Sequence, residues 1–270
     1  MTKKHGKLKR KGADRHLLYQ WTVQNPEFEL DFFDRVFRKR RRRRPRILRE
    51  DFCGTALLSS SWVENRRDRH AIGIDLDTDT LAWGRKHNLA RLDGAAERIK
   101  LLAQDVRTVT RPKADIACAY NFSYYLVYPY ADLVAYLTCV RRSLKKDGMV
   151  FLDAYGGWDS QQVMKEPREI DGPAGRFVYI WEQADFNPID NMATCYIHFG
   201  FAGGKRWKRA FTYHWRIYSP VEVRDALLAA GFSAAEIYWD RSPDEDSSDY
   251  RVTRRAENTP GWLAYIVGIK

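Results

Sequence analysis

The chain has little of what marks secreted, membrane or metal-binding proteins. Its 270 residues contain four cysteines, Cys53, Cys118, Cys139 and Cys195, which are too far apart for a C-x-x-C pair. This spacing fits neither a disulfide framework nor a zinc site, so it predicts a reducing, cytoplasmic setting. No apolar run reaches the roughly 18 residues that span a bilayer, so no membrane association is expected. The first 20 residues are basic and lack the apolar stretch of a secretory signal.

Positive charge in excess is confined to the first 46 residues. The net charge is +11, and residues 1–46 alone hold 16 Lys and Arg against five Asp and Glu. We expect residues 1–46 to form a basic tail and a helical lid, and residues 47–270 to form a globular domain without net charge. Cations of this density favour phosphates, so nucleic acid is one candidate partner of residues 1–46. A run of charge is more often a solvated surface.

Short apolar segments alternate with amphipathic ones from residue 47 onward. We expect strands at 47–51, 71–74, 99–102, 116–120, 149–154, 235–239 and 262–267, and helices at 57–64, 78–89, 131–144 and 221–230. Alternation at this spacing is typical of parallel sheets with helices on both faces. The sequence therefore predicts an α/β fold with a Rossmann-like, doubly wound, mostly parallel sheet of seven strands.

Two segments depart from this alternation. Residues 176–217 contain three strand-like runs separated by the turn signals FNPIDN and AGGK, which predicts an antiparallel β insertion within residues 170–217. The apolar positions between His16 and Phe37 predict two helices, broken near Pro26. These two helices would form the N-terminal lid.

Carboxylates follow three of the expected strands. Glu50 and Asp51 end the first, Asp75 follows the second and Asp105 follows the third. Ligands of open α/β sheets bind at the carboxyl ends of the strands. A carboxylate after the second strand suits a pair of ribose hydroxyls, one at the first turn suits an amino group, and one after the third suits the adenine amine.

Five motifs then carry a family resemblance. EDFCGTA, GIDLDTDTL, QDV, LKKDGMVFLD and AAGF occur in this order. The series resembles that of class I S-adenosylmethionine-dependent methyltransferases, over roughly residues 47–155 and 216–270. The resemblance implies a methyltransferase domain over 47–270, S-adenosyl-L-methionine as cofactor and S-adenosyl-L-homocysteine as product.

The resemblance also implies roles for single residues. Glu50 would contact the methionyl amine, Gly54 would let the backbone approach the cofactor, and Asp75 would bind the ribose. Leu76, Asp105 and Val106 would surround the adenine, and Tyr120 would lie beside the cofactor. Asn121, Tyr124 and Tyr155 would border the methyl group as catalytic residues, their aromatic faces stabilising the methyl cation as it transfers.

The expected glycine-rich turn has lost most of its glycines. The G-x-G-x-G pattern of the family is occupied by Phe52-Cys53-Gly54-Thr55-Ala56. Because glycine serves where the backbone takes a positive φ, we expect a locally different loop, with Phe52 closing over the methionine. A nicotinamide dehydrogenase shares this fold, but its pyrophosphate needs the helix start bare. The lost glycines therefore favour a sulfonium cofactor, while a Rossmann relative that binds no cofactor stays open. Arg49 lies within the first strand and is expected to pair with a carboxylate.

The methyl acceptor has two candidate classes. The antiparallel insertion and the N-terminal helices resemble the small-molecule N- and O-methyltransferase branch, in which Tyr19 of the lid would face the cofactor. Alternatively, the N-x-x-Y spacing of Asn121 and Tyr124 is that of enzymes that methylate exocyclic amines of nucleic acids. Both prolines of that motif are absent. A cofactor-binding RNA adaptor without turnover is a third alternative.

Two further features bear on function. The six histidines show no ligand spacing, so no metal is expected, although His198 or His214 could act as a general base. The arginine run 38–46 enters the first strand at its start, about 15 Å from the turn that follows this five-residue strand. We therefore expect the run to be a surface loop or a docking patch. The acceptor and the oligomeric state do not follow from the sequence.

Overall fold

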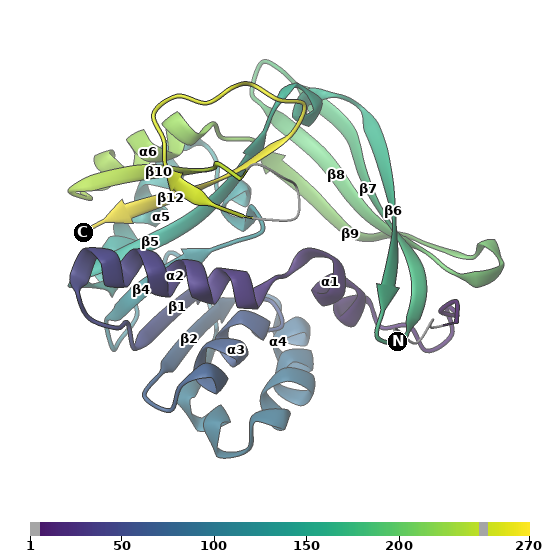
Figure 1. Cartoon of the computed structure of the whole chain (residues 1–270), viewed down its shortest axis with the longest axis horizontal. Coiled ribbons are helices and arrows are strands. Elements are labelled where there is room, and N and C mark those ends of the chain that lie inside the picture. Colours follow the sequence, from purple (N-terminus) through teal and green to yellow (C-terminus); the bar gives the residue numbers. More distant parts are fainter. Residues whose placement is uncertain (1–5, 243–247) are drawn as a thin grey trace. The chain divides into compact units, whose positions relative to one another are not determined.

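The computed structural model describes residues 6–242 and 248–270. The chain divides into two compact units (Figure 1). The smaller comprises Met1–Gln24, Gly156–Ile217 and Asn258–Gly261, and the larger comprises Asn25–Tyr155, Tyr218–Glu257 and Trp262–Lys270. This division differs from the expected boundary at residue 46, because the second N-terminal helix belongs to the larger unit. Among the described residues, no helix has both the length and the apolar character that a membrane crossing needs.

The larger unit is built on an eight-stranded sheet of order β11-β10-β12-β5-β4-β1-β2-β3. Its strands are β1 (Ile47–Asp51), β2 (His70–Asp75), β3 (Ile99–Ala103), β4 (Ala114–Ala119), β5 (Leu144–Gly156), β10 (Ala234–Asp240), β11 (Tyr250–Val252) and β12 (Trp262–Ile269). Strands β1 to β5 pair in parallel, and β10 pairs antiparallel with β11 and β12. The predicted fold class is confirmed. The sheet has one strand more than expected, because β11 is only three residues long and leaves no periodic signal.

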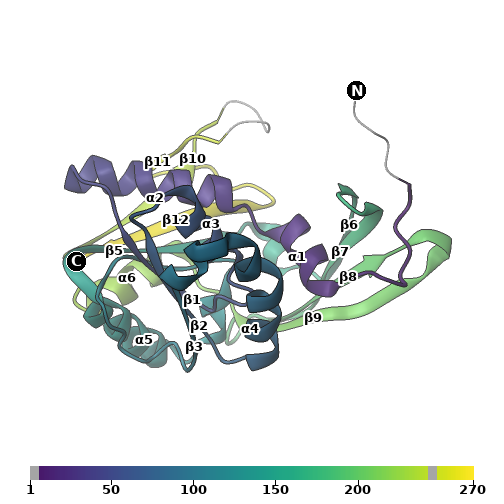
Figure 2. The ribbon, with the colours of Figure 1, turned by 90° about the horizontal axis from the view of Figure 1, so that it is seen from below.

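Helices cover both faces of this sheet. They are α2 (Pro26–Arg41), α3 (Leu57–Asn65), α4 (Thr78–Gly84), α5 (Tyr130–Ser143) and α6 (Pro220–Ala229). A π-helical turn (Arg85–Leu89) and 3₁₀ segments (Ala90–Arg98, Ser123–Leu126) complete the unit. Figure 2 shows α2 and α5 on opposite sides of the sheet, as the doubly wound topology requires. Strand β4 is buried at every position, which is typical of a central parallel strand.

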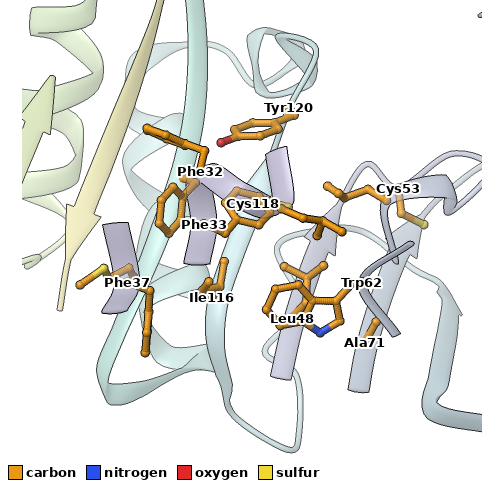
Figure 3. Close-up of a cluster of buried hydrophobic side chains, with 14 of the residues drawn as sticks. Phe32, Phe33, Phe37, Leu48, Cys53, Trp62, Ala71, Ile116, Cys118 and Tyr120 are labelled. Atoms are coloured by element: carbon orange, nitrogen blue, oxygen red, sulfur yellow. The ribbon is translucent and has the colours of Figure 1, made fainter. Parts of the chain in front are cut away.

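Helix α2 is part of the core of the larger unit. Asn25 caps it by accepting a hydrogen bond from the Phe28 N–H, and Pro26 follows as its first residue. Its face of Phe32, Phe33 and Phe37 is fully buried and packs toward the strands (Figure 3). Burying three phenylalanines contributes roughly 5–9 kcal/mol. A helix with so much buried apolar surface is a structural element of the larger unit, and the lid role of residues 1–46 stays a prediction.

The smaller unit consists of helix α1 and an antiparallel sheet. Helix α1 (Arg15–Val23) is capped by Asp14, and the sheet order is β6 (Met164–Gly172), β7 (Gly175–Asn187), β8 (Met192–Gly200) and β9 (Arg206–Arg216). Leu18 of α1 packs in one cluster with Phe177 and Phe199 of the sheet. Short 3₁₀ turns lie at Trp158–Gln161 and Ala202–Gly204. The sheet has four strands where three were expected, since the run MKEPREIDG of β6 is mostly exposed and charged and lacks an apolar alternation.

Candidate active site at the carboxyl edge of the sheet

The turn after β1 keeps three residues in the left-handed region. Phe52, Gly54 and Ala56 have φ of 55°, 51° and 55°. These are the three positions where the family pattern has glycine, so replacing two glycines has not removed the backbone conformation that glycine favours. The different loop that the sequence predicted is therefore not found in these φ angles. Phe52 packs edge-on against Tyr136, with ring centroids 6.0 Å apart.

Helix α4 and the π turn hold this loop from outside. A Cβ on Gly84 would lie 2.4 Å from the Thr55 carbonyl oxygen, so only glycine permits the close approach. The Asn88 side-chain amide donates to the same carbonyl at 2.8 Å. The loop is thus fixed by contacts that depend on the residues at positions 84 and 88.

Glu50 is buried next to the start of α3. Its Oε2 accepts from the Ser59 backbone N–H at 2.9 Å and from the Ser59 hydroxyl. Ala56, the N-cap residue of α3, has no side-chain cap, and Glu50 supplies the missing acceptor. Burial raises the pKa of Glu50 to about 7, against the lowering effect of the two Ser59 hydrogen bonds. The expected partner of the methionyl amine is therefore buried, and no described cation forms an ion pair with it.

Asp75 ends β2 and faces the same loop. Its Oδ2 accepts from the Gly54 N–H at 2.7 Å and its Oδ1 accepts from the Asp77 N–H at 2.9 Å. Each oxygen retains a lone pair, so the carboxylate can still accept from two hydroxyls. Gly54 and Asp75, predicted from separate motifs, are thus in direct contact.

A hollow of about 470 Å³ opens beside Asp75, a volume typical of small-molecule sites. It is lined by Phe52, Asp75, Leu76, Asp77, Asp105, Val106, Arg107, Leu126, Val127, Tyr128 and Asp132. Three of these are large apolar residues with much exposed surface: Leu76 at 71%, Leu126 at 48% and Tyr128 at 43%. Apolar surface exposed within a hollow marks a place where a ligand is covered. The hollow joins five predicted residues, namely Phe52, Asp75, Leu76, Asp105 and Val106.

Asp105 carries a partner that the sequence did not suggest. The Arg107 guanidinium donates to both carboxylate oxygens of Asp105, at 3.0 and 2.6 Å, and the Arg107 backbone N–H donates a third hydrogen bond of 2.7 Å. These hydrogen bonds from Arg107 lower the pKa of Asp105. Asp105 is thus ionised and oriented, and an adenine amine would share it with the guanidinium.

Arg49 pairs with a carboxylate, as predicted. Its Nε donates to Asp51 Oδ1 at 2.8 Å, and neither side chain is exposed by more than 1%. The two Nη atoms donate to the carbonyls of Val106 and Thr108 and to the Ser143 hydroxyl. The guanidinium therefore fixes the backbone of the loop after β3. Val106 lies in this loop, directly after Asp105.

The turn after β4 is held by a buried carboxylate. Asn121 and Phe122 are both left-handed, with φ of 56° and 57°, and their N–H groups donate to Asp153 at 2.7 and 3.0 Å. Burial raises the pKa of Asp153 to about 7, although both N–H bonds lower it. Asp153 was not identified from the sequence. A charged residue within an apolar strand, which drew attention to Arg49, also occurs here, because Asp153 interrupts the apolar run MVFLDAY.

The predicted aromatic residues after β4 divide into packed and partly open groups. Tyr124 is fully buried and donates its hydroxyl to the Asp153 carbonyl at 2.8 Å. Tyr155 is half-buried and stacks at a tilt on Phe122, with centroids 4.6 Å apart. The contacts of Tyr124 are those of a structural residue, whereas Asn121, Phe122 and Tyr155 keep some exposure.

Tyr120 packs inside the core together with an acid that sequence reasoning overlooked. Its ring lies 5.4 Å from those of Phe33 and Tyr265, and its buried hydroxyl has no hydrogen-bond partner among the described residues. Glu29 of α2 is buried nearby; burial, and then the charges of Glu50 and Asp153, raise its pKa to about 8. Within its helix Glu29 resembles any first-turn acid, so its burial could not be predicted from a local pattern.

The remaining candidates lie in the smaller unit. Tyr19 of α1 packs on Phe211, with centroids 4.9 Å apart. The His198 ring approaches Glu182 at 2.7 Å and accepts from the Arg209 N–H, while His214 lies 3.3 Å from the Thr194 hydroxyl. Across the described part of the chain, no group of three or more His, Cys, Asp or Glu side chains is arranged to hold a metal ion.

The carboxyl edge suits a nucleoside with a cationic extension. Asp75 can accept from hydroxyls, Asp105 can accept from an amine, and Leu76 and Val106 offer apolar faces to a flat ring. Among the described residues, Glu50, Asp153 and Glu29 are buried carboxyls that form no ion pair, so a positively charged ligand would compensate their desolvation. This combination fits S-adenosylmethionine, which carries adenine, ribose and two positive charges.

Comparison with known proteins adds a fold assignment. Neither a protein-family model nor a curated protein matches the chain. Among solved structures, DesVI of Streptomyces venezuelae matches 97% of this chain and 99% of its own, with a TM-score of 0.70 and 16% identity. The sugar N-methyltransferase KedS8 from a Streptoalloteichus species matches 96% of this chain and 93% of its own, with a TM-score of 0.65 and 18% identity.

A third match is the amino pentose methyltransferase CalS10 of Micromonospora echinaspora, solved with S-adenosylmethionine bound. It covers 94% of this chain and 95% of its own, with a TM-score of 0.67 and 15% identity. Likeness at this level of identity concerns the fold, and here it extends over nearly the whole chain, including both sheets. The chain therefore has the fold of class I S-adenosylmethionine-dependent methyltransferases that the motif series predicted.

Proposed function

We propose that the protein is an S-adenosylmethionine-dependent methyltransferase that acts on a small-molecule acceptor. The observation that carries this proposal is the hollow at the carboxyl edge of the sheet. There Asp75 and Asp105, each at the end of its own strand, meet the exposed apolar surface of Leu76 and Leu126. Acidic acceptors for ribose and adenine beside an uncovered apolar wall are what this cofactor requires.

The cofactor roles follow the geometry. Asp75 would accept from the ribose hydroxyls, and Asp105 from the adenine amine, with Leu76 and Val106 against the ring faces. Glu50 would attract the methionyl ammonium, which its lack of a cationic partner favours. Gly54 and Phe52 would border the methionine moiety, and Tyr120 would contribute core packing below it.

The bound cofactor would supply an electrophilic methyl group on a sulfonium. The chain's own contribution would be alignment and exclusion of water. Asp153 holds the left-handed turn of Asn121 and Phe122 in place, so the Asn121 side chain starts from a fixed backbone. Asn121 and Tyr155 are therefore proposed to orient the acceptor, and Tyr124 to support the turn from within.

An amine on a sugar is the first acceptor class to test. KedS8 is described as a sugar N-methyltransferase and CalS10 as an amino pentose methyltransferase, and both match this chain over more than nine tenths of its length. In the residues themselves, buried carboxyls that have no cationic partner among the described residues would also bind a protonated amine, which must lose its proton before the nitrogen lone pair can attack the methyl group. A cytoplasmic location remains a prediction that the four free cysteines support.

A nucleic-acid acceptor is less well supported. In enzymes with the N-x-x-Y motif, the tyrosine stacks on a flipped base. Here Tyr124 is fully buried and its hydroxyl is bonded to the Asp153 carbonyl, so stacking would require the turn to open. The alternative of a cofactor-binding adaptor without turnover is separated by the assay below.

Calorimetry with S-adenosylmethionine and S-adenosylhomocysteine tests the cofactor assignment. We expect both to bind, and Asp75→Asn to weaken binding at least 100-fold, because two charge-assisted hydrogen bonds to the ribose are lost. Asp79→Asn, an exposed acid outside the hollow, is the matched control and should change little. If neither compound binds the unaltered protein, the proposal is wrong.

Turnover is tested separately. Amine-bearing sugars, hydroxylated small molecules and RNA should be incubated with the protein and labelled S-adenosylmethionine, and the products identified by mass. A methylated amino sugar would support the acceptor class. Cofactor binding without product from any pool would favour the adaptor instead.

A further inference from the structure

The arginine run builds a basic hollow at the amino edge of the main sheet. Its space of about 490 Å³ is lined by Arg35, Arg38, Lys39, Arg42, Arg43 and Arg44. Arg38 and Lys39 lie three and four residues after Arg35 on α2, so these three share one face of the helix, and Arg42 is its C-cap. Every residue that lines this hollow is a cation, which sets it apart from the hollow at the carboxyl edge.

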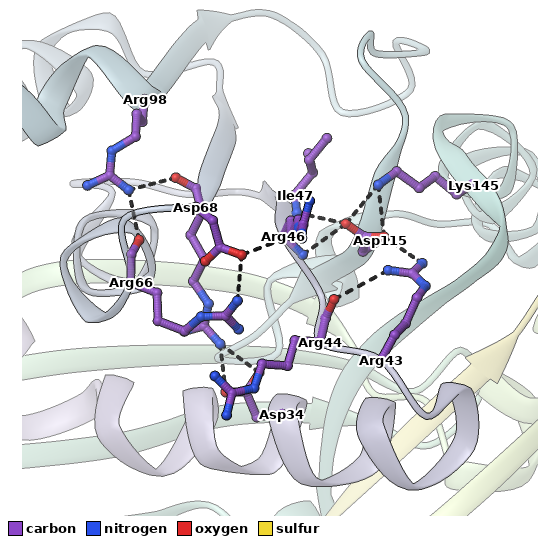
Figure 4. Close-up of polar contacts among 11 residues, drawn as sticks. Asp34, Arg43, Arg44, Arg46, Ile47, Arg66, Asp68, Arg98, Asp115 and Lys145 are labelled. Carbon is purple, nitrogen blue, oxygen red and sulfur yellow. Dashed lines mark hydrogen bonds and ion pairs between the residues drawn. The ribbon is translucent and has the colours of Figure 1, made fainter.

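Part of the run is committed to the fold. Arg43 donates to Asp147 at 2.8 Å and to Asp115 at 2.7 Å, as Figure 4 shows for Asp115. Arg40 pairs with Glu236, and Arg35 donates to the Tyr250 carbonyl at 3.2 Å. These side chains fasten the end of α2 to the strands, so their presence has a structural explanation.

Four cations of the hollow have no such explanation. Within the described ranges, the side chains of Arg38, Lys39, Arg42 and Arg44 form no ion pair, and all four are exposed. One or two cations at the end of a helix stabilise its dipole by about 0.3–1 kcal/mol each. Further like charges at neighbouring positions repel by about 0.2–0.5 kcal/mol per pair. The cluster thus costs stability in the free protein, and an anionic ligand would offset that cost.

The composition of the lining indicates which anion fits. Guanidinium groups match phosphate oxygens with paired N–H donors, and backbone phosphates are the usual targets of Arg and Lys in nucleic-acid complexes. The lining holds no aromatic residue to stack on a base and no apolar pocket to anchor a peptide side chain. It would therefore contact a chain of phosphates without selecting among bases.

We propose that this hollow is a docking surface for the phosphate backbone of nucleic acid. The inference is independent of the proposed methyl transfer, since the two hollows lie at opposite edges of the sheet. Asp115 and Asp147, which fix Arg43, lie near the starts of β4 and β5. Asp75, in contrast, is the last residue of β2, and Asp105 follows the end of β3. A bound strand would leave the cofactor hollow accessible.

Salt dependence of binding is the direct test. A fluorescent 12-nucleotide oligouridylate should bind the full chain, with log K falling against log salt at a slope near −3, about 0.7 for each of four phosphate contacts. This slope corresponds to a loss of roughly 50-fold between 50 and 200 mM salt. A slope shallower than −1 would overturn the proposal.

A charge-matched pair of variants locates the site. Arg38→Gln/Lys39→Gln/Arg42→Gln/Arg44→Gln should abolish most of the slope, because it removes the four unpaired cations. Lys7→Gln/Lys9→Gln/Arg10→Gln/Lys11→Gln removes the same charge from the N-terminal segment and should retain it. Equal losses in both variants would mean that only net charge matters, which contradicts a site. Equal binding of poly-glutamate would show that the surface takes an acidic protein instead. The melting temperature of the first variant should not fall, since its side chains are exposed and their mutual repulsion is removed.

Discussion

Buried carboxylates at the two edges of the main sheet have pKa values shifted in opposite directions. At the amino edge, burial would raise the pKa of Asp115, but bonds from Lys145, the N–H groups of Arg46 and Ile47, and Arg43 outweigh it and hold the pKa low. At the carboxyl edge, the donors to Glu50 and Asp153 within the described residues are all uncharged, and burial raises the pKa of both to about 7. The same type of group is charged and paired at one edge and unpaired at the other.

This difference separates stability from function. An ion pair that is complete within the chain needs nothing further, and Asp115 joins α2 and β1 to β4 and β5 in this way. Unpaired buried acids cost free energy until a proton or a cationic ligand compensates them. The carboxyl edge also holds four non-glycine residues with positive φ, Phe52, Ala56, Asn121 and Phe122. Costs of this kind gather at binding sites.

Arg49 is the strongest test of this comparison, because it is a fully paired cation at the carboxyl edge. Arg49→Met leaves Asp51 buried without its cation, so we expect the free energy of unfolding to fall by about 3–5 kcal/mol. The melting temperature should drop by roughly 10 °C in thermal unfolding. Cofactor affinity should fall as well, since the Val106 and Thr108 carbonyls lose their donor.

Arg107→Met is the matched control for Arg49. It breaks the ion pair with Asp105 in the loop after β3. Because these two side chains are 53% and 39% exposed, we expect the free energy of unfolding to change by less than about 1 kcal/mol. If the two variants were equally mild, burial would not decide the strength of pairs at this edge. The double variant Arg49→Met/Asp51→Leu should recover part of the loss by removing the orphaned charge.

The pH dependence of stability should differ in sign between the two edges. Glu29, Glu50 and Asp153 have folded pKa values near 8, 7 and 7, above their unfolded values, so their contribution is full below about pH 4 and is lost as the pH rises through 7 to 8. Asp115 has a lowered pKa, so its contribution is lost only in acid, below its unfolded value of about 4. We expect the melting temperature to fall by about 5 °C or more between pH 5.5 and 8.5.

Single variants can show which carboxyl groups cause each part of the dependence of the melting temperature on pH. Glu29→Gln and Glu50→Gln should each flatten the fall above pH 6, and Glu50→Gln keeps an acceptor for Ser59. Asp115→Asn should leave this fall intact and remove stability that the unaltered protein has at neutral pH. A saturating cationic cofactor should also reduce the fall. A flat profile in the unaltered protein would show that the buried acids already have compensating partners.

Much of the carboxyl edge was predictable because strand ends follow from periodicity. Asp75 and Asp105 meet in one hollow since parallel strands place their carboxyl ends together, and the pairing of Arg49 followed from the cost of burying it. Spacing alone cannot tell a buried Tyr124 hydroxyl that is bonded to a carbonyl from one that faces a ligand.

Other features depended on tertiary packing that no local pattern records. Glu29 is buried by the rotation of α2, and Arg107 binds Asp105 through side-chain geometry two residues away. Strand β6 pairs through its backbone while its side chains stay exposed, so it has no apolar alternation. In each case the sequence supplied the residue type, and the fold decided its surroundings.

The smallest effect concerns left-handed residues at the two edges. Arg42, the C-cap of α2, has φ of 53° and an exposed side chain, whereas Ala56, the N-cap of α3, has φ of 55° and is fully buried. Arg42→Gly relieves about 1–2 kcal/mol of strain. Its main cost is the extra conformational entropy that glycine gives the unfolded chain, so we expect the free energy of unfolding to rise by about 1 kcal/mol. Ala56→Gly gains the same relief but gives up a buried methyl worth about 0.8 kcal/mol, so it should be nearly neutral. Thermal unfolding should show the first variant 2–4 °C higher, by the usual conversion. If instead Ala56→Gly were the more stabilising, the turn after β1 would carry more strain than its φ angles indicate, and the carboxyl edge would be costlier than the amino edge in its backbone as well as in its buried acids.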